Sequence, residues 1–397
     1  MKRREFLLLS AGGLILLSRP VLVKPQVMDN EHITLFLCGD IMSGRGIDQV
    51  LPHSVDPMLY EPYVRDARQY VEIAEQANGP IPRPVDFAYI WGDGLDELAR
   101  ADVRIINLET SVTTSSAYER GKGINYRMHP NNIPVLTTAG IDVCVLANNH
   151  VLDWGREGLL ETLRTLEDAN IKTSGAGRNE AKAQAPAIIE IADKGRVLVL
   201  AYGMESSGVP SHWAAKSEQP GVNILPDLSR ASAQQINEQV RALKQPRDIV
   251  VVSIHWGGNW GYDISRDQRQ FAHQLIDNAQ VDIIHGHSSH HVKGIEVYKD
   301  KPVIYGCGDL INDYEGIEGY EYYRDDLALM YFVRMSPGTG KLVSMEMVPR
   351  QIRRFRTNPA LDEDVLWLQH VLNREGKSFN TRVEVTAEKH LELHWQS

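Results

Sequence analysis

Six short apolar runs along this chain each end in Asp, Asn, Glu or His. The runs read ITLFLCGD, RIINLE, DVCVLANNH, VVVSIHWG, VDIIHGHSSHH and VIYGCGD. Short apolar runs bounded by polar residues predict buried strands. In an open α/β sheet, ligands bind just beyond the carboxyl ends of the strands. We therefore expect the six polar clusters to come together as one site built from distant parts of the sequence.

Helical and strand patterns alternate between and around these runs. In residues 155–169, for instance, leucines recur at helical spacing. Strands separated by helices favour an α/β fold with parallel pairing, and hairpin-like segments indicate that the sheet is mixed. The expected helices are residues 95–101, 132–139, 155–169, 228–244 and 266–278, and the expected later strands are 103–108, 142–147, 187–191, 196–201, 249–254, 295–298, 303–305 and one at Ile283.

The expected main domain comprises residues 31–325. Two segments depart from the alternation of helices and strands, one within this domain and one after it. Residues 51–90 carry six prolines around a helical pattern near 63–77, which predicts an insertion after the first strand. The insertion would form a lid or rim of the site, or a plain surface excursion. Residues 326–397 predict a small C-terminal extension. It comprises an antiparallel hairpin of 327–335 and 341–354, a helix at 362–373 and a strand-like tail.

The first 30 residues begin with MKRREFLLLSAGGLILLSRP and are excluded from the main domain. Basic residues precede an apolar run of about a dozen residues, which is the layout of an export signal and is short for a membrane span. Arg3 and Arg4 resemble a twin-arginine signal, which exports folded proteins. We expect an exported protein that is periplasmic, extracellular or membrane-anchored. The alternatives are an uncleaved N-terminal anchor and a cytoplasmic protein with an apolar start.

The composition narrows the function classes. With 397 residues, of which 43% are hydrophobic, the chain can bury a large core. The net charge of −10 and the lack of a long basic stretch give no support to nucleic-acid binding. The cysteines, Cys38, Cys144 and Cys307, lie inside apolar runs without CxxC spacing, which favours small buried apolar roles over redox or metal-binding roles.

Carboxylates and an amide follow the first two apolar runs. Gly39 permits a sharp turn after which Asp40 projects beyond the strand, although an Asp in this place also caps turns. Asn107 and Glu109 lie on the same side of their strand if it continues that far. The alternative is a turn-forming Asn beside a solvated Glu. Both carboxylates are candidates for metal binding.

Asn148, Asn149 and His150 directly follow the apolar sequence VCVLA. Two amides and an imidazole are costly beside a core unless they have partners. Asn oxygen and His nitrogen both bind divalent metals, whereas the alternative for His150 is a hydrogen-bonded core histidine. Asp153 would orient a ligand or cap the helix that begins near Gly155.

Histidines dominate the later clusters. His255 follows IVVVSI, and four of the fourteen histidines fall within HGHSSHH, directly after VDII. Chance or surface decoration explains this poorly after an apolar run, so we favour metal binding. His287 and His290 are the best pair of ligands, and His285 or His291 would support them from behind.

The candidate ligands outnumber the needs of one tetrahedral ion. Carboxylate, amide and imidazole donors without thiolate suit Mn, Fe or Zn. The set would suit two ions about 3.5–4 Å apart, a pair that generates hydroxide and holds an oxyanion. Asp309, in GCGDLIND, is left out because a turn after a strand explains it slightly better. The candidate ligands are Asp40, Glu109, Asn149, His150, His255, His287 and His290.

The order of these motifs resembles that of the calcineurin-like metallophosphatase superfamily. More closely, GDIM, NLE, LANNHVLDWG, IHWG and GHSSHH resemble the CapA family of capsule synthesis, also named for poly-γ-glutamate synthesis, over residues 33–312. The resemblance implies a four-layer α/β/β/α sandwich with the site at the sheet ends. It also implies that the seven candidate ligands occupy the metal-site positions. Independently of the resemblance, we expect Asn107, Asp153 and His285 to support these ligands from behind.

Three departures from the general metallophosphatase pattern bear on the number of ions. Met42 stands where the DxH motif has histidine, and Asn107-Leu108-Glu109 stands in place of GDxxD. Two serines separate His287 from His290, where GHxH has a single residue. The first two departures are typical of the CapA group. The loss of two ligands would leave a site for one ion or for none.

Three functions stay open at this point. The first is metal-dependent hydrolysis of a phosphoester or amide, with His150 as the acid for the leaving group and Arg45 or Arg127 holding an anionic substrate group. The second, implied by the family name, is a non-catalytic component that binds an anionic polymer such as poly-γ-glutamate beside other envelope polymer-synthesis proteins. The third is a cytoplasmic metallophosphatase.

Overall fold

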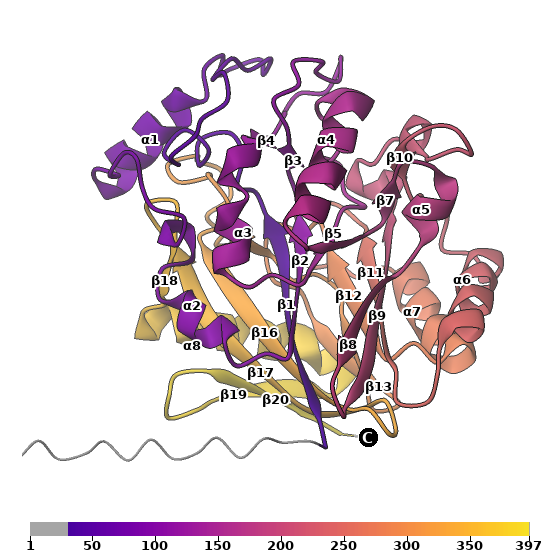
Figure 1. Cartoon of the computed structure of the whole chain (residues 1–397). Coiled ribbons are helices and arrows are strands. Elements are labelled where there is room, and N and C mark those ends of the chain that lie inside the picture. Colours follow the sequence, from indigo (N-terminus) through magenta and orange to yellow (C-terminus); the bar gives the residue numbers. More distant parts are fainter. Residues whose placement is uncertain (1–30, 397) are drawn as a thin grey trace, which may run out of the picture.

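The computed structural model describes residues 31–396 and contains two large mixed β-sheets (Figure 1). From edge to edge, the first sheet comprises β19 (Thr381–Val385), β20 (Leu391–Trp395), β17 (Lys341–Ile352), β16 (Leu327–Ser336), β1 (Ile33–Ile41), β2 (Val103–Leu108), β5 (Val143–Val145) and β6 (Lys172–Ser174), with β15 (Asp309–Ile311) beside β1 and β18 (Thr357–Pro359) beside β17. Central strand β1 pairs in parallel with β2 and β15, and β2 pairs in parallel with β5. The carboxyl ends of these strands therefore reach the same edge.

The second sheet comprises, in order, β13 (Ile295–Tyr298), β14 (Lys301–Ile304), β12 (Ile283–His287), β11 (Ile249–His255), β9 (Gly195–Gly203) and β8 (Ala187–Ile191). Strands β9, β11, β12 and β14 are parallel, whereas β8 and β13 form antiparallel edges. Two small pairs join β3 (Ser111–Val112) to β4 (Arg127–Met128) and β7 (Ala176–Gly177) to β10 (Gly221–Val222).

Helices cover the outer faces of the two sheets. The α-helices are α1 (Arg68–Asn78), α2 (Gly94–Leu98), α3 (Pro134–Thr138), α4 (Gly155–Asp168), α5 (Glu180–Gln184), α6 (Arg230–Leu243), α7 (Arg266–Ala279) and α8 (Asp362–Gly376). Short 3-10 helices lie at Tyr89–Trp91, Pro130–Asn132, Glu205–Ser207, Ser211–Trp213 and Lys377–Phe379.

Alternate residues of the strands pack against different layers. In β9, Val197 and Val199 belong to a core shared with the first sheet, whereas Leu198 and Leu200 pack in a second core with residues of α6 and α7. Helices α3 and α4 pack into the first core and lie over the outer face of the first sheet (Figure 1). The fold is therefore a four-layer α/β/β/α sandwich, which confirms the predicted fold class.

The helix predicted near residues 63–77 is shorter than expected. It begins only at Arg68, because the backbone first turns back on itself where the amide of Leu59 donates to the carbonyl of Arg65. Asp66 then accepts the amide of Arg68 through its side chain at 2.9 Å, which ends the turn and starts α1. Local side-chain to backbone bonds of this kind compete with a helix at its first residues.

The two ends of the chain were predicted to carry additional segments. At the C-terminus, the hairpin of β16 and β17 enlarges the first sheet, because β16 pairs along β1 from Ile33 with Met335 to Leu37 with Tyr331. The strand-like tail is a hairpin, β19 and β20, rather than one strand. The predicted N-terminal signal or anchor lies outside the described residues. Within residues 31–396, no helix is both long and apolar enough to traverse a membrane.

A buried ion cluster fixes the insertion to the rest of the sandwich. Arg45, which follows β1 and is 3% exposed, donates from Nε to Asp313 Oδ2 at 2.9 Å and from Nη1 to Glu61 Oε1 at 3.2 Å. Its guanidinium lies 3.7 Å from the ring centroid of Tyr70, whose hydroxyl donates to Glu61. Because Glu61 and Tyr70 belong to the insertion and Asp313 follows β15, the cluster joins three distant segments.

Replacing Arg45 by methionine is expected to destabilise the protein by about 3–5 kcal/mol, because two buried carboxylates lose their cation. Chemical denaturation followed by circular dichroism measures this change. The matched control is Arg178→Met, because the ion pair of Arg178 with Glu167 is exposed and its loss should change the free energy of unfolding little. Equal effects of the two substitutions would contradict the anchoring role of Arg45.

Candidate metal centre

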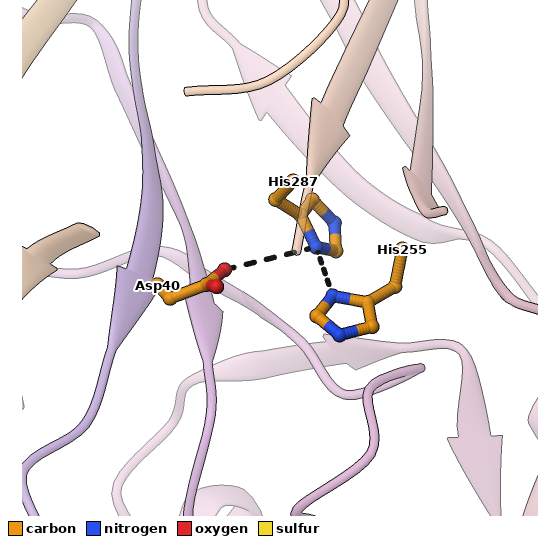
Figure 2. A group of neighbouring side chains, drawn as sticks. All are labelled: Asp40, His255 and His287. Atoms are coloured by element: carbon orange, nitrogen blue, oxygen red, sulfur yellow. Dashed lines mark hydrogen bonds and ion pairs between the residues drawn. The ribbon is translucent and has the colours of Figure 1, made fainter. Parts of the chain in front are cut away.

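Polar strand ends from both sheets meet at one edge of the sandwich. Asp40 lies near the end of β1, in register with Asp309 of β15 and with Asn107 of β2. In the second sheet, β11 ends in His255 and β12 ends in His287, and these two residues are also in register. Figure 2 shows Asp40 and the two histidines converging from the two sheets. The structure thus brings together side chains that are more than two hundred residues apart in the sequence.

Asp40, His255 and His287 form a first group whose ligand atoms all lie within 4.8 Å of one another. The Nδ1 atoms of the two histidines are 2.7 Å apart, and His287 Nδ1 is 3.9 Å from Asp40 Oδ1 (Figure 2). None of the three residues is more than 1% exposed. Two nitrogens and a carboxylate oxygen therefore face one small space that is closed to solvent.

Asp40, His290 and Asp309 form a second group within the same distance limit. His290 Nδ1 is 2.9 Å from Asp309 Oδ1 and 3.9 Å from Asp40 Oδ2. Burial lowers the pKa of His290, but the charges of Asp309 and Asp40 outweigh burial and raise it. Asp40 belongs to both groups and turns one carboxylate oxygen toward each, which is the arrangement of a bridging ligand.

Burial makes this concentration of carboxylates unfavourable without a counter-charge. Burial, and then the charge of Asp309, raise the pKa of Asp40 to about 7. Burial and the neighbouring Asp40 raise the pKa of Glu109 well above its ordinary value. Burial also lowers the pKa of His255 and of His287, so neither imidazole supplies a positive charge. The centre therefore requires protons or a cation to neutralise it.

The two groups fit a divalent metal ion. Asp40 Oδ2 is buried and has no hydrogen-bond partner among the described residues, which is costly for a carboxylate oxygen. A cation between the groups would satisfy this atom. Carboxylate oxygens and imidazole nitrogens are ordinary donors to divalent ions of intermediate hardness. The three cysteines are unpaired and buried, and none belongs to either group.

Glu109 lies beside the two groups, where Asn107 holds it next to Asp40. Asn107 Nδ2 donates to Asp40 Oδ1 at 2.7 Å and to Glu109 Oε2 at 2.8 Å. The Oδ1 atom of Asn107 accepts a hydrogen bond from Asn148 Nδ2 at 2.9 Å. Glu109 Oε2 is also 3.8 Å from His255 Nδ1. The amide chain of Asn148 and Asn107 thus orients both carboxylates toward the histidines.

His150 lies on the far side of Glu109, with its Nε2 3.9 Å from Glu109 Oε1. Its Nδ1 is 2.7 Å from Asp153 Oδ2 and 2.9 Å from Nζ of Lys122, which also pairs with Asp153. Burial lowers the pKa of His150 to about 4, so the imidazole is neutral near pH 7. Asp153 only accepts hydrogen bonds whereas the ammonium of Lys122 only donates them, so these two neighbours of Nδ1 favour opposite tautomers. In the tautomer in which Nδ1 donates to Asp153, Nε2 is free to take up a proton.

Several predicted site residues lie away from the two groups. Asn149 contacts the opposite side of His255, with its Oδ1 3.2 Å from Nε2. Arg45 is held by the buried ion cluster, and Arg127 donates to two backbone carbonyls and is 6% exposed. Protein groups already bind both guanidiniums, and the binding of a substrate anion by one of these arginines stays a prediction.

The sequence patterns did not identify two residues that contact the candidate ligands, Asp309 and Lys122. Asp309 was explained as a turn residue, yet it lies in β15 beside Asp40 and contacts His290. The available signal was Gly308-Asp309 after an apolar run, the same pattern as Gly39-Asp40. Lys122 lies in an irregular segment between β3 and β4, where no periodic pattern could have pointed to His150.

The fold and the centre define a four-layer α/β protein whose buried His and Asp groups could hold a metal ion. Residues 34–314 match the family model described as bacterial capsule synthesis protein PGA_cap, and the chain therefore belongs to this family. A probable polyglutamine synthesis accessory protein of Mycobacterium tuberculosis is 44% identical over 366 residues, covering 91% of this chain and 96% of the relative. The PGA biosynthesis protein CapA of Bacillus subtilis is 28% identical over 358 residues, covering 90% and 81% respectively. The predicted family is thereby confirmed.

Solved structures resemble the chain more distantly. A novel phosphatase from Mycoplasma pneumoniae is 12% identical, with a TM-score of 0.44 over 80% of this chain and 93% of that chain. A hypothetical protein from Thermus thermophilus is also 12% identical, with a TM-score of 0.43 over 80% of this chain and 99% of that chain.

In protein freed of metal by a chelator, Asp40→Asn is expected to become more stabilising as the pH rises. The pKa of Asp40 is about 7 in the folded protein and about 3.9 when unfolded, so its stabilising contribution is full below about pH 4 and is lost as the pH rises through about 7. The free energies of unfolding of the two proteins should diverge by up to about 1.4 kcal/mol per pH unit in this window. Urea denaturation at several pH values measures the gap, and a gap that is constant with pH would refute the buried ionisation.

Proposed function

We propose that this chain binds two divalent metal ions, Mn, Fe or Zn, and hydrolyses a phosphoester or amide bond during synthesis of an anionic cell-envelope polymer. The observation that carries this proposal is that Asp40 belongs to both ligand groups, one with His255 and His287 and the other with His290 and Asp309. A carboxylate shared in this way suits a pair of ions, as in two-metal hydrolases. Glu109 supplies a further oxygen beside the first group.

The ions, when bound, would supply Lewis-acid polarisation and an activated nucleophile. The chain would supply the handling of protons through His150. Asp153 and Lys122 hold the imidazole in one orientation, so that Nε2 faces the centre beside Glu109. His150 can take a proton at this atom and return it to the leaving group, which is the role of a general acid–base.

The names of the relatives support the substrate class. The Mycobacterium tuberculosis relative is named for polyglutamine synthesis and the Bacillus subtilis relative for PGA biosynthesis. The proposed substrate is therefore an amide-linked or phosphate-bearing anionic polymer or its precursor, handled together with other proteins of polymer synthesis.

We also propose export by the twin-arginine-like N-terminus, with cell fractionation as the test. Recovery of the protein in the cytoplasm alone would favour a cytoplasmic phosphatase instead.

A non-catalytic, polymer-binding role is the second candidate, and one observation favours it. Asp40, His255 and His287 are at most 1% exposed, and His290 is 5% exposed. A bulky polymer would reach these residues only after the surrounding loops move. In this role, the ions would stabilise the junction of the two sheets while the polymer binds at the surface.

Protein purified without chelators is expected to contain about two divalent ions per chain, because two ligand groups share one carboxylate. Elemental analysis by mass spectrometry measures the content and identifies the metal. His287→Ala should lose most of the metal, whereas the control His212→Ala should retain it, because the side chain of His212 is 64% exposed and pairs with Glu119. Metal-free wild-type protein that also fails to take up Mn, Fe or Zn would refute the proposed centre.

His150→Ala is expected to reduce turnover by about a hundredfold or more while metal content is preserved, because His150 lies outside both ligand groups. The assay uses bis(p-nitrophenyl) phosphate for phosphoester hydrolysis and γ-glutamyl-p-nitroanilide for amide hydrolysis. His212→Ala again serves as the control. If the metal-loaded wild-type protein hydrolyses neither compound but retains binding to poly-γ-glutamate, the polymer-binding role replaces the hydrolase.

A further inference from the structure

A chain of buried hydrogen bonds lies behind His287 and has no part in the functions described so far. Ser253 of β11 places its Oγ 2.8 Å from His287 Nε2 and 3.1 Å from His285 Nδ1. On its other side, His285 Nε2 is 2.8 Å from the carbonyl oxygen of Cys38 in β1. Ser253, His285 and His287 are each at most 1% exposed. Water therefore does not compete for these bonds.

The donor and acceptor of each hydrogen bond in this series can be assigned by starting from the carbonyl oxygen of Cys38. A backbone carbonyl only accepts, so His285 Nε2 must carry a proton and donate to Cys38. A neutral imidazole carries one ring proton, so Nδ1 of His285 is then an acceptor. The hydroxyl of Ser253 then donates to His285 Nδ1. A hydroxyl has only one proton, so Ser253 must accept the proton of His287 Nε2.

These hydrogen bonds determine the protonation of His287 Nδ1, the ring nitrogen that faces the candidate centre. A neutral imidazole with its proton on Nε2 has a free lone pair on Nδ1. Nδ1 is the atom that lies 3.9 Å from Asp40 Oδ1 and 2.7 Å from His255 Nδ1. The carbonyl of Cys38 also lies on β1, two residues before Asp40, so the chain of bonds links the Asp40 strand to the histidine lone pair across the two sheets.

Asn149 fixes the tautomer of His255 in a similar way, through a contact on the side of the ring away from His287. Its Nε2 is 3.2 Å from Asn149 Oδ1, and an amide oxygen only accepts, so the proton of His255 lies on Nε2. Two unprotonated Nδ1 atoms therefore face each other at 2.7 Å, an arrangement that repels unless a cation lies between them and Asp40. Asn149, predicted as a metal ligand, would act by orienting His255.

We propose that Ser253 is a positioning residue that fixes His287 in the Nε2-protonated tautomer and so presents Nδ1 to a metal ion. Asn149 has the matching role for His255. The tautomer of His287 follows from the hydrogen bonds alone, whereas its effect on metal affinity rests on the proposed metal centre. Groups that support a metal ligand in this way commonly change metal affinity about 10- to 100-fold when they are removed.

The tautomer is tested in the chelator-treated full-length protein by nitrogen-15 NMR of labelled histidine side chains, with His287 assigned from a His287→Gln variant. The wild-type protein should carry the His287 proton on Nε2. In Ser253→Ala, Nε2 has lost its acceptor, and the proton should move in part to Nδ1, toward Asp40. A proton on Nδ1 in the wild-type protein, or an unchanged tautomer in Ser253→Ala, would overturn the proposal.

Metal affinity is tested by titrating Zn²⁺ or Mn²⁺ into the same proteins. Ser253→Ala should bind about 10- to 100-fold more weakly, and Ser253→Thr, which restores a hydroxyl, should recover most of the affinity. The matched control is Ser174→Ala, because Ser174 is 1% exposed and its hydroxyl has no hydrogen-bond partner among the described residues. Wild-type protein that binds no metal would defeat the proposed function but leave the NMR test intact. Equal affinities of the wild-type and Ser253→Ala proteins would defeat the positioning role alone.

Discussion

The burial of Asp40 between the two sheets is the constraint on which the candidate centre depends. β1 is the central strand of the first sheet, and its end lies against the ends of β11 and β12 from the second sheet. A carboxylate in this place costs free energy unless a proton or a cation neutralises it. The raised pKa of Asp40, to about 7 through burial and then Asp309, expresses that cost. The histidines and Asp309 are arranged around this one charge.

The chain neutralises another buried carboxylate near the centre in a different way. Asp313 accepts two hydrogen bonds from the guanidinium of Arg45, which also binds Glu61. Asp40 receives one hydrogen bond from Asn107, and its second oxygen has no partner among the described residues. The protein thus supplies an arginine to Asp313 but no cationic side chain that hydrogen-bonds to Asp40 among the described residues. That contrast supports the proposal that a metal ion binds at Asp40.

The sequence predicted the parts of this arrangement that follow from local pattern. Asp40, His255 and His287 come directly after apolar runs, and the carboxyl ends of parallel strands meet at one edge, so their convergence could be expected. The alternation of strand and helix patterns predicted the α/β class with a mixed sheet, whereas the four layers were implied by the resemblance to the CapA family. Asp309 could not be distinguished from a turn residue, because the same Gly-Asp pair serves both purposes. The contact of Lys122 depends on the path of an irregular segment, which has no periodicity.

Two further features of the structure could not be predicted from the sequence patterns, namely the pairing of distant strands and the direction of side chains in a bend. The pairing of β16 with β1 joins segments about three hundred residues apart, and no pattern within either strand names its partner. Asn149, predicted as a metal ligand, contacts His255, whereas Asn148 donates to Asn107. Both residues lie in a bend beyond the end of β5, where strand alternation no longer predicts side-chain direction.

The most direct test of the central claim is anomalous X-ray diffraction from crystals of the protein grown with Mn²⁺ or Zn²⁺. Two peaks that share Asp40 are expected, one within about 2.0–2.3 Å of Nδ1 of His255 and His287 and the other equally close to His290 and Asp309. The absence of any anomalous peak near Asp40, or peaks confined to other parts of the molecule, would contradict it.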